Sequence, residues 1–248
     1  MSFRPPETRC PWSGAVLLPF ASRPIVASSS GESKAGLTGV GPHPESGADP
    51  RVGIFGGTFD PPHAGHAIVA REVVEALGLN RLLWVPAATP PHKTGRALTP
   101  PGVRRRLVEA AIESDPRFEL CDLELERGGV SYTIDTLRRL RADHPRWSLY
   151  LVVGMDLLAG FARWKESAAI PELAEVVVIA RAGVPEEVAL AAVRDPALPD
   201  GRVRFVQVTP VDISSARVRS RLAGNLAVRG MVTPAVRAVI EREGLYRA

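Results

Sequence analysis

Two histidines and a pair of glycines mark the run from Gly56 to His66, which directly follows a short apolar stretch. The run reads Gly-Gly-Thr-Phe-Asp-Pro-Pro-His-Ala-Gly-His. Its glycine pair, Gly56 and Gly57, lets the backbone turn and lets an anion approach the backbone N–H groups closely. Since His63 and His66 are three residues apart, both imidazoles lie on one face at the start of the following helix, beside its free N–H groups. The combination predicts a phosphate-binding site.

Two familiar alternatives do not fit this run. Its spacing is neither that of a P-loop nor that of the dinucleotide-binding fingerprint. A zinc site is disfavoured because no further Cys, His or acidic ligand follows at a suitable spacing. We therefore predict no dedicated metal site in the chain.

Three more motifs of this kind follow, and each also has a plain structural explanation. Residues 89–93 (Thr-Pro-Pro-His-Lys) form either a stiff turn that displays a histidine and a lysine at the end of a strand or simply a solvated loop. Residues 131–136 (Ser-Tyr-Thr-Ile-Asp-Thr) open a helix that Ser131 or Thr133 could merely cap. Residues 213–219 (Ile-Ser-Ser-Ala-Arg-Val-Arg) combine a second helix N-terminus with a guanidinium, either for phosphate or as an ordinary cap.

The elements that must position these motifs alternate between strands and helices from residue 51 onward. Apolar runs predict strands at residues 52–55, 82–85, 118–125, 149–153, 175–180 and 203–208. Helical spacing predicts helices ending at Leu77, over residues 101–113 and 131–141, and twice near the C-terminus, the last over 233–243. The alternation indicates an α/β fold: a Rossmann-like, doubly wound parallel sheet with flanking helices and a small C-terminal helical part. Such sheets bind ligands beyond the carboxyl ends of their strands, which is where the motifs stand.

The first fifty residues have a different composition. They contain eight Ser, six Gly and eight Pro, and their four basic and four acidic residues cancel. We interpret residues 1–50 as a disordered extension or as sequence upstream of the true start codon, with a transit peptide as a third alternative. Residues 51–248 would form the folded domain and carry the whole formal charge of +4.

The composition of the chain limits the kinds of molecule that it is expected to bind. The mild positive charge suits anionic small molecules. No apolar run reaches the length of a membrane span, and Cys10 and Cys121 define no disulfide framework, so we expect a cytoplasmic protein. The basic residues 104–106 are not interleaved with aromatics, which favours a solvated helix face or anion contacts over nucleic-acid binding.

The run from Gly56 to His66 resembles the (H/T)xGH signature of the nucleotidyltransferase superfamily related to class I aminoacyl-tRNA synthetases. Its longer form is similar to bacterial nicotinate-nucleotide adenylyltransferases. The resemblance covers roughly residues 51–246 and rests on five motifs in the same order, including Gly-Met-Asp at 154–156 with Trp164 beyond it. One departure is Ala216, where the family pattern has threonine.

The resemblance implies a role for each matched residue. Catalytic roles fall to His63, His66, Lys93 and Arg219. ATP binding falls to Gly56, Gly57, Phe59, His63, His66, Gly154, Asp156, Ser214, Ser215 and Arg219. Binding of the acceptor falls to Thr58, Thr89, Thr133, Asp135 and Trp164, although a tryptophan often serves only for packing.

The implied reaction is adenylyl transfer from ATP to nicotinate mononucleotide, giving deamido-NAD and pyrophosphate in NAD biosynthesis. Because the acceptor's phosphate is already anionic near neutral pH, we expect no catalytic carboxylate. Mg²⁺ is expected on the polyphosphate, mostly through phosphate oxygens and water. No nucleic acid or membrane is expected as a partner, and a homo-oligomer is left open.

Rival functions remain open at this point. The acceptor could instead be nicotinamide mononucleotide or phosphopantetheine, and a second rival is cytidylyl transfer to an alcohol phosphate. A non-catalytic dinucleotide-binding regulator on the same fold is a rival of another class, but it would be expected to have lost phosphate ligands.

Overall fold

The computed structural model describes residues 49–91, 97–158, 160–181 and 203–247. Our interpretation of residues 1–50 lies outside the described residues except for the last two, and the predicted role of Lys93 lies outside them as well. Among the described residues, no helix combines the length and hydropathy that a membrane span requires.

A six-stranded sheet forms the centre of the fold, and every pair of neighbouring strands is parallel. Its strands are β1 (Arg51–Gly57), β2 (Arg81–Pro86), β3 (Phe118–Leu120), β4 (Ser148–Gly154), β5 (Glu175–Arg181) and β6 (Val203–Val208). Their order across the sheet is β3-β2-β1-β4-β5-β6, so the direction of winding reverses between β1 and β4. The loops that leave β1 and β4 depart to opposite faces at this point, which opens a crevice at the carboxyl ends.

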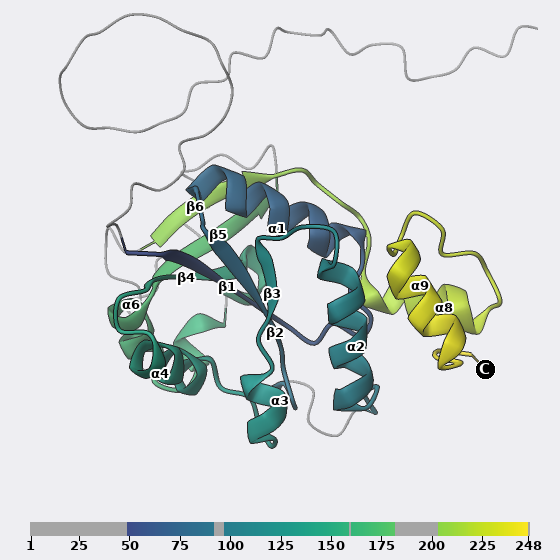
Figure 1. The fold of residues 1–248 in the computed structure, drawn as a ribbon, viewed down its shortest axis with the longest axis horizontal. Helices are drawn as coiled ribbons and strands as arrows, with labels where there is room; N and C mark the ends of the chain where they lie inside the picture. The colour runs from purple at the N-terminus through teal and green to yellow at the C-terminus, as the bar shows by residue number, and fades with distance from the viewer. Residues whose placement is uncertain (1–48, 92–96, 159, 182–202, 248) are drawn as a thin grey trace, which may run out of the picture. The chain divides into compact units, whose positions relative to one another are not determined.

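Helices cover both faces of the sheet (Figure 1). They are α1 (Ala64–Leu77), α2 (Pro101–Ile112), α3 (Leu123–Arg127), α4 (Thr133–Asp143), α5 (Met155–Leu158), α6 (Ile170–Leu173), α8 (Ser215–Ala223) and α9 (Pro234–Arg242). Because side chains of a strand alternate between faces, Tyr150 and Val152 of β4 join the cluster under α1 and α2, while Leu151 and Val153 join the cluster under α4 and α6. The predicted doubly wound α/β fold is confirmed.

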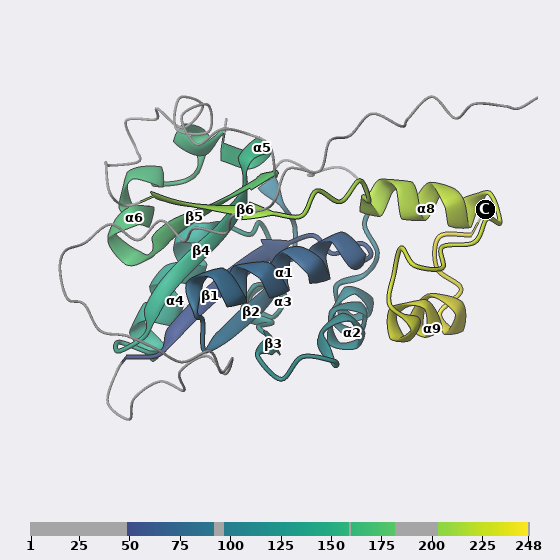
Figure 2. The same cartoon turned by 90° about the horizontal axis from the view of Figure 1, so that it is seen from above.

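The residues predicted to end α1 and to begin α9 do so in the structure. Gly78 ends α1 with a left-handed φ of 57°. The hydroxyl of Thr233 accepts a hydrogen bond from the N–H of Val236 at 3.2 Å, and Pro234 follows it as the first residue of α9. In Figure 2, α9 lies beside α2, and α8 and α9 make up the small C-terminal helical part.

The predicted strand over residues 118–125 is wrong in its second half. Strand β3 ends at Leu120, and the chain then forms α3 over Leu123–Arg127. Leu120 of β3 packs against the cluster under α1 and α2, whereas Leu123 of α3 packs against the cluster on the other face of the sheet. Burial of Glu124, whose carboxylate accepts a hydrogen bond from the hydroxyl of Thr136 at 2.7 Å, adds a contact that favours the helix.

The prediction of a solvated basic face over residues 104–106 is also wrong at its first position. The side chain of Arg104 is completely buried. Arg105 and Arg106 do lie on the surface, where they form ion pairs with Asp122 and Glu243. Arg104 precedes Leu107 and Val108 by one helical turn, so it belongs to the buried stripe of α2.

Candidate active site

The loop after β1 is shaped by a buried phenylalanine. Phe59 is 1% exposed, has a positive φ of 49°, and packs against the rings of Phe55 and Trp84. A Cβ atom at Gly57 would come within 2.8 Å of the Phe59 ring, so glycine is required there. The backbone from Gly57 onward is therefore held close to the sheet, and a ligand could contact Phe59 only through its backbone.

The two histidines stand at the N-terminus of α1, as the spacing predicts. His63 is the N-cap residue, and its backbone N–H donates to Nδ1 of His66 at 3.1 Å. The two imidazole rings are stacked with their centroids 3.7 Å apart. Because Nδ1 of His66 accepts a hydrogen bond, the ring's proton is on Nε2, which is thereby a donor.

Burial affects the charge of His63. It lowers the pKa of the His63 imidazole from 6.5 to about 4. In the ligand-free protein the ring is therefore neutral near pH 7. A neutral imidazole approaches an anion as a hydrogen-bond donor rather than as an ion-pair partner.

The N-terminus of α8 is docked onto the same loop. The hydroxyl of Ser214 caps the helix by accepting a hydrogen bond from the N–H of Arg217 at 3.2 Å. Ser215 Oγ donates to the carbonyl oxygen of Pro61 at 2.8 Å, and the guanidinium of Arg219 donates to the carbonyl oxygen of Asp60 at 2.7 Å. Two motifs that are about 150 residues apart in the sequence thus meet. Ser215 and Pro61, which share a hydrogen bond, are separated by 154 positions.

A cavity of about 660 Å³ lies between these two helix ends, and we call it the histidine cavity. Among its lining residues are nine that the sequence resemblance assigns to ATP: Gly56, Gly57, His63, His66, Gly154, Asp156, Ser214, Ser215 and Arg219. The exposed carboxylate of Asp156 faces this cavity from α5, directly after β4. Two helix N-termini, two imidazoles and a guanidinium give the cavity the donors that a polyphosphate requires.

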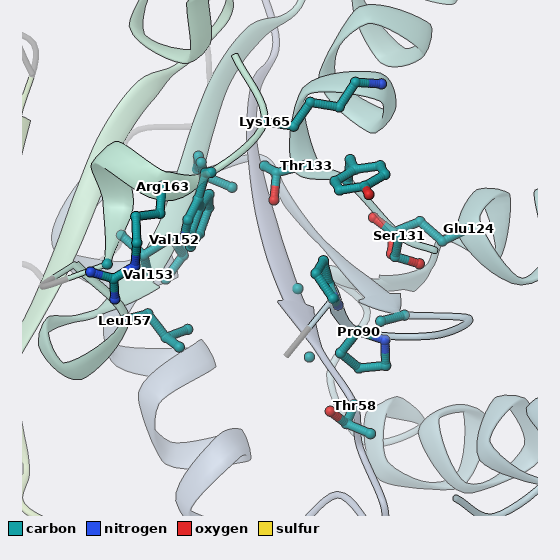
Figure 3. A pocket seen from close by; sticks show the side chains of 18 of the residues that line it. Thr58, Pro90, Glu124, Ser131, Thr133, Val152, Val153, Leu157, Arg163 and Lys165 are labelled. Carbon is teal, nitrogen blue, oxygen red and sulfur yellow. The ribbon is translucent and has the colours of Figure 1, made fainter. Parts of the chain in front are cut away.

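A second cavity of about 580 Å³ adjoins the first, and we call it the tryptophan cavity (Figure 3). It shares Gly56, Gly57, Thr58, Val152, Asp156 and Leu157 with the histidine cavity. Its other walls include Ala87 and Pro90 from the loop after β2, Ser131 to Thr133 at the start of α4, Glu124, and Arg163 to Lys165. Figure 3 shows Thr58 and Pro90 at one end of this cavity, with Ser131 and Thr133 facing Val152 and Arg163 across it.

The walls of the tryptophan cavity combine flat apolar surface with polar groups. Trp164 is half-buried and packs against the ring of Phe161, with a centroid distance of 5.2 Å. Lys165 donates to both carboxylate oxygens of Asp135 and lies 4.9 Å from the centroid of the Tyr132 ring. The cavity therefore suits a flat aromatic ring, since the charge of Lys165 is largely balanced by Asp135.

Two residues that the resemblance assigns to the acceptor line neither cavity. Asp135 is engaged by Lys165. The carbonyl oxygen of Thr89 accepts a hydrogen bond from the N–H of Ser131 at 2.9 Å, so this residue joins the loop after β2 to the start of α4. Thr58, Thr133 and Trp164 do line the tryptophan cavity, and the ligand contacts of all five residues stay predictions.

Sequence reasoning missed three buried or half-buried polar residues that support the site. The carboxylate of Asp60 accepts hydrogen bonds from the hydroxyl of Tyr246 at 2.7 Å and from the N–H of Thr99 at 3.4 Å. Burial raises the pKa of the Tyr246 phenol, which keeps it a donor. Arg104 is the third of these residues. The position of Asp60 inside the glycine-histidine run was a signal for Asp60, whereas nothing near Tyr246 pointed to its partner.

Comparison with known proteins gives the family. Residues 54–221 match the family model described as cytidylyltransferase-like. A protein of Thermus thermophilus named "probable nicotinate-nucleotide adenylyltransferase" is 42% identical over 198 residues, which cover 79% of this chain and 100% of that protein. One of the same name from Salinibacter ruber is 40% identical over 196 residues, which cover 79% of this chain and 97% of the relative. The chain belongs to the nicotinate-nucleotide adenylyltransferase family.

Solved structures agree with this family's fold. Plasmodium falciparum nicotinic acid mononucleotide adenylyltransferase, in its complex with NaAD, superposes with a TM-score of 0.65 over 79% of this chain and 97% of that chain. Its complex with APC gives a TM-score of 0.63 over the same shares. Sequence identity is 20% in both cases, so these two structures bear on the fold alone. As a member of the nicotinate-nucleotide adenylyltransferase family, the chain is a nucleotidyltransferase that acts on nucleotides.

Proposed function

We propose that the chain transfers the adenylyl group of ATP to nicotinate mononucleotide, releasing pyrophosphate and forming deamido-NAD in NAD biosynthesis. The observation that carries the proposal is the shared wall of the two cavities at Gly56 to Thr58 and at Asp156 and Leu157. A polyphosphate in the histidine cavity and a flat ring in the tryptophan cavity would meet at this wall. The relatives' names support the choice of acceptor.

In the reaction, a phosphate oxygen of nicotinate mononucleotide attacks the α-phosphorus of ATP. A new phosphorus–oxygen bond forms, and the bond from the α-phosphorus to the bridging oxygen breaks, with its electron pair leaving on pyrophosphate. The attacking oxygen carries no proton to remove near neutral pH, so no general base is needed. Catalysis then comes from positioning two anions and stabilising charge in the transition state.

Four groups of the histidine cavity supply that stabilisation in our proposal. His66 donates from Nε2, His63 donates as a neutral imidazole, and Arg219 adds a positive charge oriented by the backbone carbonyl oxygen of Asp60. The N–H groups at the start of α8, including that of Ser215, would bind the leaving phosphates. Asp156 is the candidate for a ribose hydroxyl, and Lys93 stays a further candidate for phosphate.

Mg²⁺ is the expected ion, and the donor set of the histidine cavity suits an ion that arrives on the nucleotide. Of the two carboxylates that line the cavity, Asp60 is buried and bonded to Tyr246, whereas Asp156 is exposed. Among the described residues, no cluster of three His, Cys, Asp or Glu side chains could hold a metal on its own. Bound Mg²⁺ would neutralise polyphosphate charge, mainly through phosphate oxygens and water.

In our proposal, the ring of Trp164 stacks on the pyridine of the acceptor, and Thr58 and Thr133, which line the same cavity, contact the rest of that nucleotide. We further propose that the enzyme works in the cytoplasm, where ATP is available. Nucleic acid and membranes are not among its proposed partners, and a homo-oligomer is left open.

A pyrophosphate-release assay tests this function. ATP and CTP are each paired with nicotinate mononucleotide, nicotinamide mononucleotide and phosphopantetheine, in the presence of Mg²⁺. We expect the highest kcat/KM for ATP with nicotinate mononucleotide, and loss of that signal in His66→Ala prepared in the same way. A higher kcat/KM for another pair would reassign the substrate, and no turnover with any pair would support a non-catalytic nucleotide-binding role.

A further inference from the structure

We propose that Arg104 is a positioning residue that sets the separation between two walls of the tryptophan cavity. It ties the loop after β1 to the loop after β2, although its own side chain lines neither cavity. The proposal deepens the proposed function, because the cavity concerned is the one assigned there to nicotinate mononucleotide.

The guanidinium of Arg104 is fully buried and bonded to backbone oxygens alone. Nη1 donates to the carbonyl oxygens of Thr58 at 3.0 Å and of Ala87 at 2.5 Å. Nη2 donates to the carbonyl oxygen of Ala88 at 2.9 Å, and Nε donates to that of Thr99 at 2.9 Å. One rigid, planar group thus joins three separate segments of backbone.

These segments diverge where the sheet ends. Gly57 and Pro86 are the last paired residues of β1 and β2, and the N–H of Ala87 donates to the carbonyl oxygen of Gly57 just beyond them. Past that bond the ladder between the two strands stops, and Arg104 supplies the next link, from Thr58 to Ala87 and Ala88. The N–H of Ala88 in turn donates to Ser131 Oγ at 2.9 Å, which extends the link to the start of α4.

Stability alone is a poor reason for an arginine at this position. Burial lowers the pKa of Arg104, with an opposing contribution from the charge of Asp60. A buried cation is costly to desolvate, and apolar replacements of buried charges are often neutral or stabilising in proteins. Leu107 and Val108 on the same stripe of α2 show that apolar side chains pack well beside it. Fixing three backbone segments at once is something that an apolar side chain cannot do.

The link has an asymmetric consequence for the two cavities. Thr58 lines both of them, whereas Ala87 and Ser131 line only the tryptophan cavity. Loosening the link moves one wall of the tryptophan cavity relative to another. Arg104 also bonds Thr99, next to Leu98 of the histidine cavity, but that cavity keeps the contacts of Ser215 and Arg219 with the loop.

The first test compares Arg104→Lys with Arg105→Lys, a matched change at the next residue, which is exposed and lines neither cavity. A lysine at position 104 keeps the charge but cannot span all four oxygens with a planar fork. We expect the KM for nicotinate mononucleotide to rise roughly tenfold in Arg104→Lys, the scale of a lost hydrogen bond to a charged group, with the KM for ATP changed less than about threefold. Equal changes in both KM values, or no change in either, would overturn the proposal.

A second measurement does not depend on the identity of the substrate. Amide hydrogen exchange in the ligand-free protein should become faster at Ala88 and at neighbouring N–H groups of the two loops in Arg104→Lys, and should stay unchanged in Arg105→Lys. If wild-type protein fails to turn over nicotinate mononucleotide, the proposed function fails, while this measurement still decides the role of Arg104. Unchanged exchange in these loops would refute that role.

A third variant covers the case in which Arg104→Lys does not fold. Arg104→Ala leaves a cavity that methylguanidinium can fill, and the ion is added at a non-denaturing concentration against potassium chloride at the same ionic strength. We expect methylguanidinium, and not potassium, to restore the low KM for nicotinate mononucleotide. If Arg104→Lys is unfolded and methylguanidinium restores nothing, Arg104 serves the fold alone and the proposal is wrong.

Discussion

The histidine cavity and the tryptophan cavity share a wall, but their polar side chains have different kinds of partner. In the histidine cavity, neighbouring backbone atoms orient the polar groups: His66 is held by the N–H of His63, and Arg219 by the carbonyl oxygen of Asp60. In the tryptophan cavity, the charge of Lys165 is paired with that of Asp135. This difference fits our proposal that one cavity stabilises charge on a ligand, whereas the other selects a ligand by shape and stacking.

The strongest test of this comparison is His66→Ala. If the histidine cavity stabilises charge in the transition state, loss of the Nε2 donor should lower kcat by about 100-fold or more, as for other lost transition-state donors. Steady-state kinetics with saturating ATP and acceptor would measure it. His144→Ala is the control, because His144 stacks on Trp147 and lines neither cavity. Turnover within a few-fold of wild type would remove His66 from the catalytic groups.

The next largest effect is expected from Arg219→Ala. Removing a charged donor should raise the KM for ATP roughly tenfold or more, with a smaller change in the KM for the acceptor. Arg217→Ala on the same helix is the matched control, since Arg217 is exposed and pairs with Asp212 outside both cavities. A larger effect from Arg217 than from Arg219 would mean that Arg217 makes the phosphate contact.

Trp164→Ala probes the other side of the comparison. Loss of ring stacking should raise the KM for nicotinate mononucleotide about three- to tenfold and leave the KM for ATP nearly unchanged. Trp164→Phe keeps an aromatic ring and should recover most of the affinity. An unchanged acceptor KM in the alanine variant would assign Trp164 to packing against Phe161.

The smallest effect concerns His63 in the ligand-free protein. Its pKa is 6.5 when unperturbed and about 4 in the folded state, so the unfolded chain binds the proton more readily. Folding stability from this group is complete above pH 6.5 and is lost as the pH falls from 6.5 towards 4. Between pH 7 and pH 6 the loss should be roughly 0.5–1 kcal/mol, and it should be absent in His63→Asn. Denaturant unfolding at the two pH values measures it, and an equal loss in both proteins would contradict a buried, neutral His63.

The fold was largely predictable because its signals are local. The unbroken apolar run of β4 reflects burial on both faces of a parallel strand, and Gly78 and Thr233 mark helix ends by their own conformations. The strand over residues 118–125 was predicted wrongly for the same reason. Its apolar residues alternate imperfectly, and this local pattern does not show that the strand ends at Leu120 and that a short helix follows from Leu123.

The sequence predicted the hydrogen-bond donors of the candidate site, but not the residues that hold the surrounding loops in place. His63, His66 and Arg219 were identified from residue type and spacing, and the structure brings them to one cavity. The basic residues 104–106, by contrast, look alike in sequence. Arg104 alone turns into the core, because α2 directs that position toward the carbonyl oxygens of two loops.

By itself, the sequence determined which chemical groups this protein places after its strands, and hence predicted a phosphate site beside a helix N-terminus. Tertiary structure decided which partner each polar group finds. Tyr246 reaches Asp60 across 186 positions, and Arg104 reaches Thr58 across 46. Periodicity and spacing record local conformation and burial, whereas such partners are set by the way in which the sheet brings distant loops together.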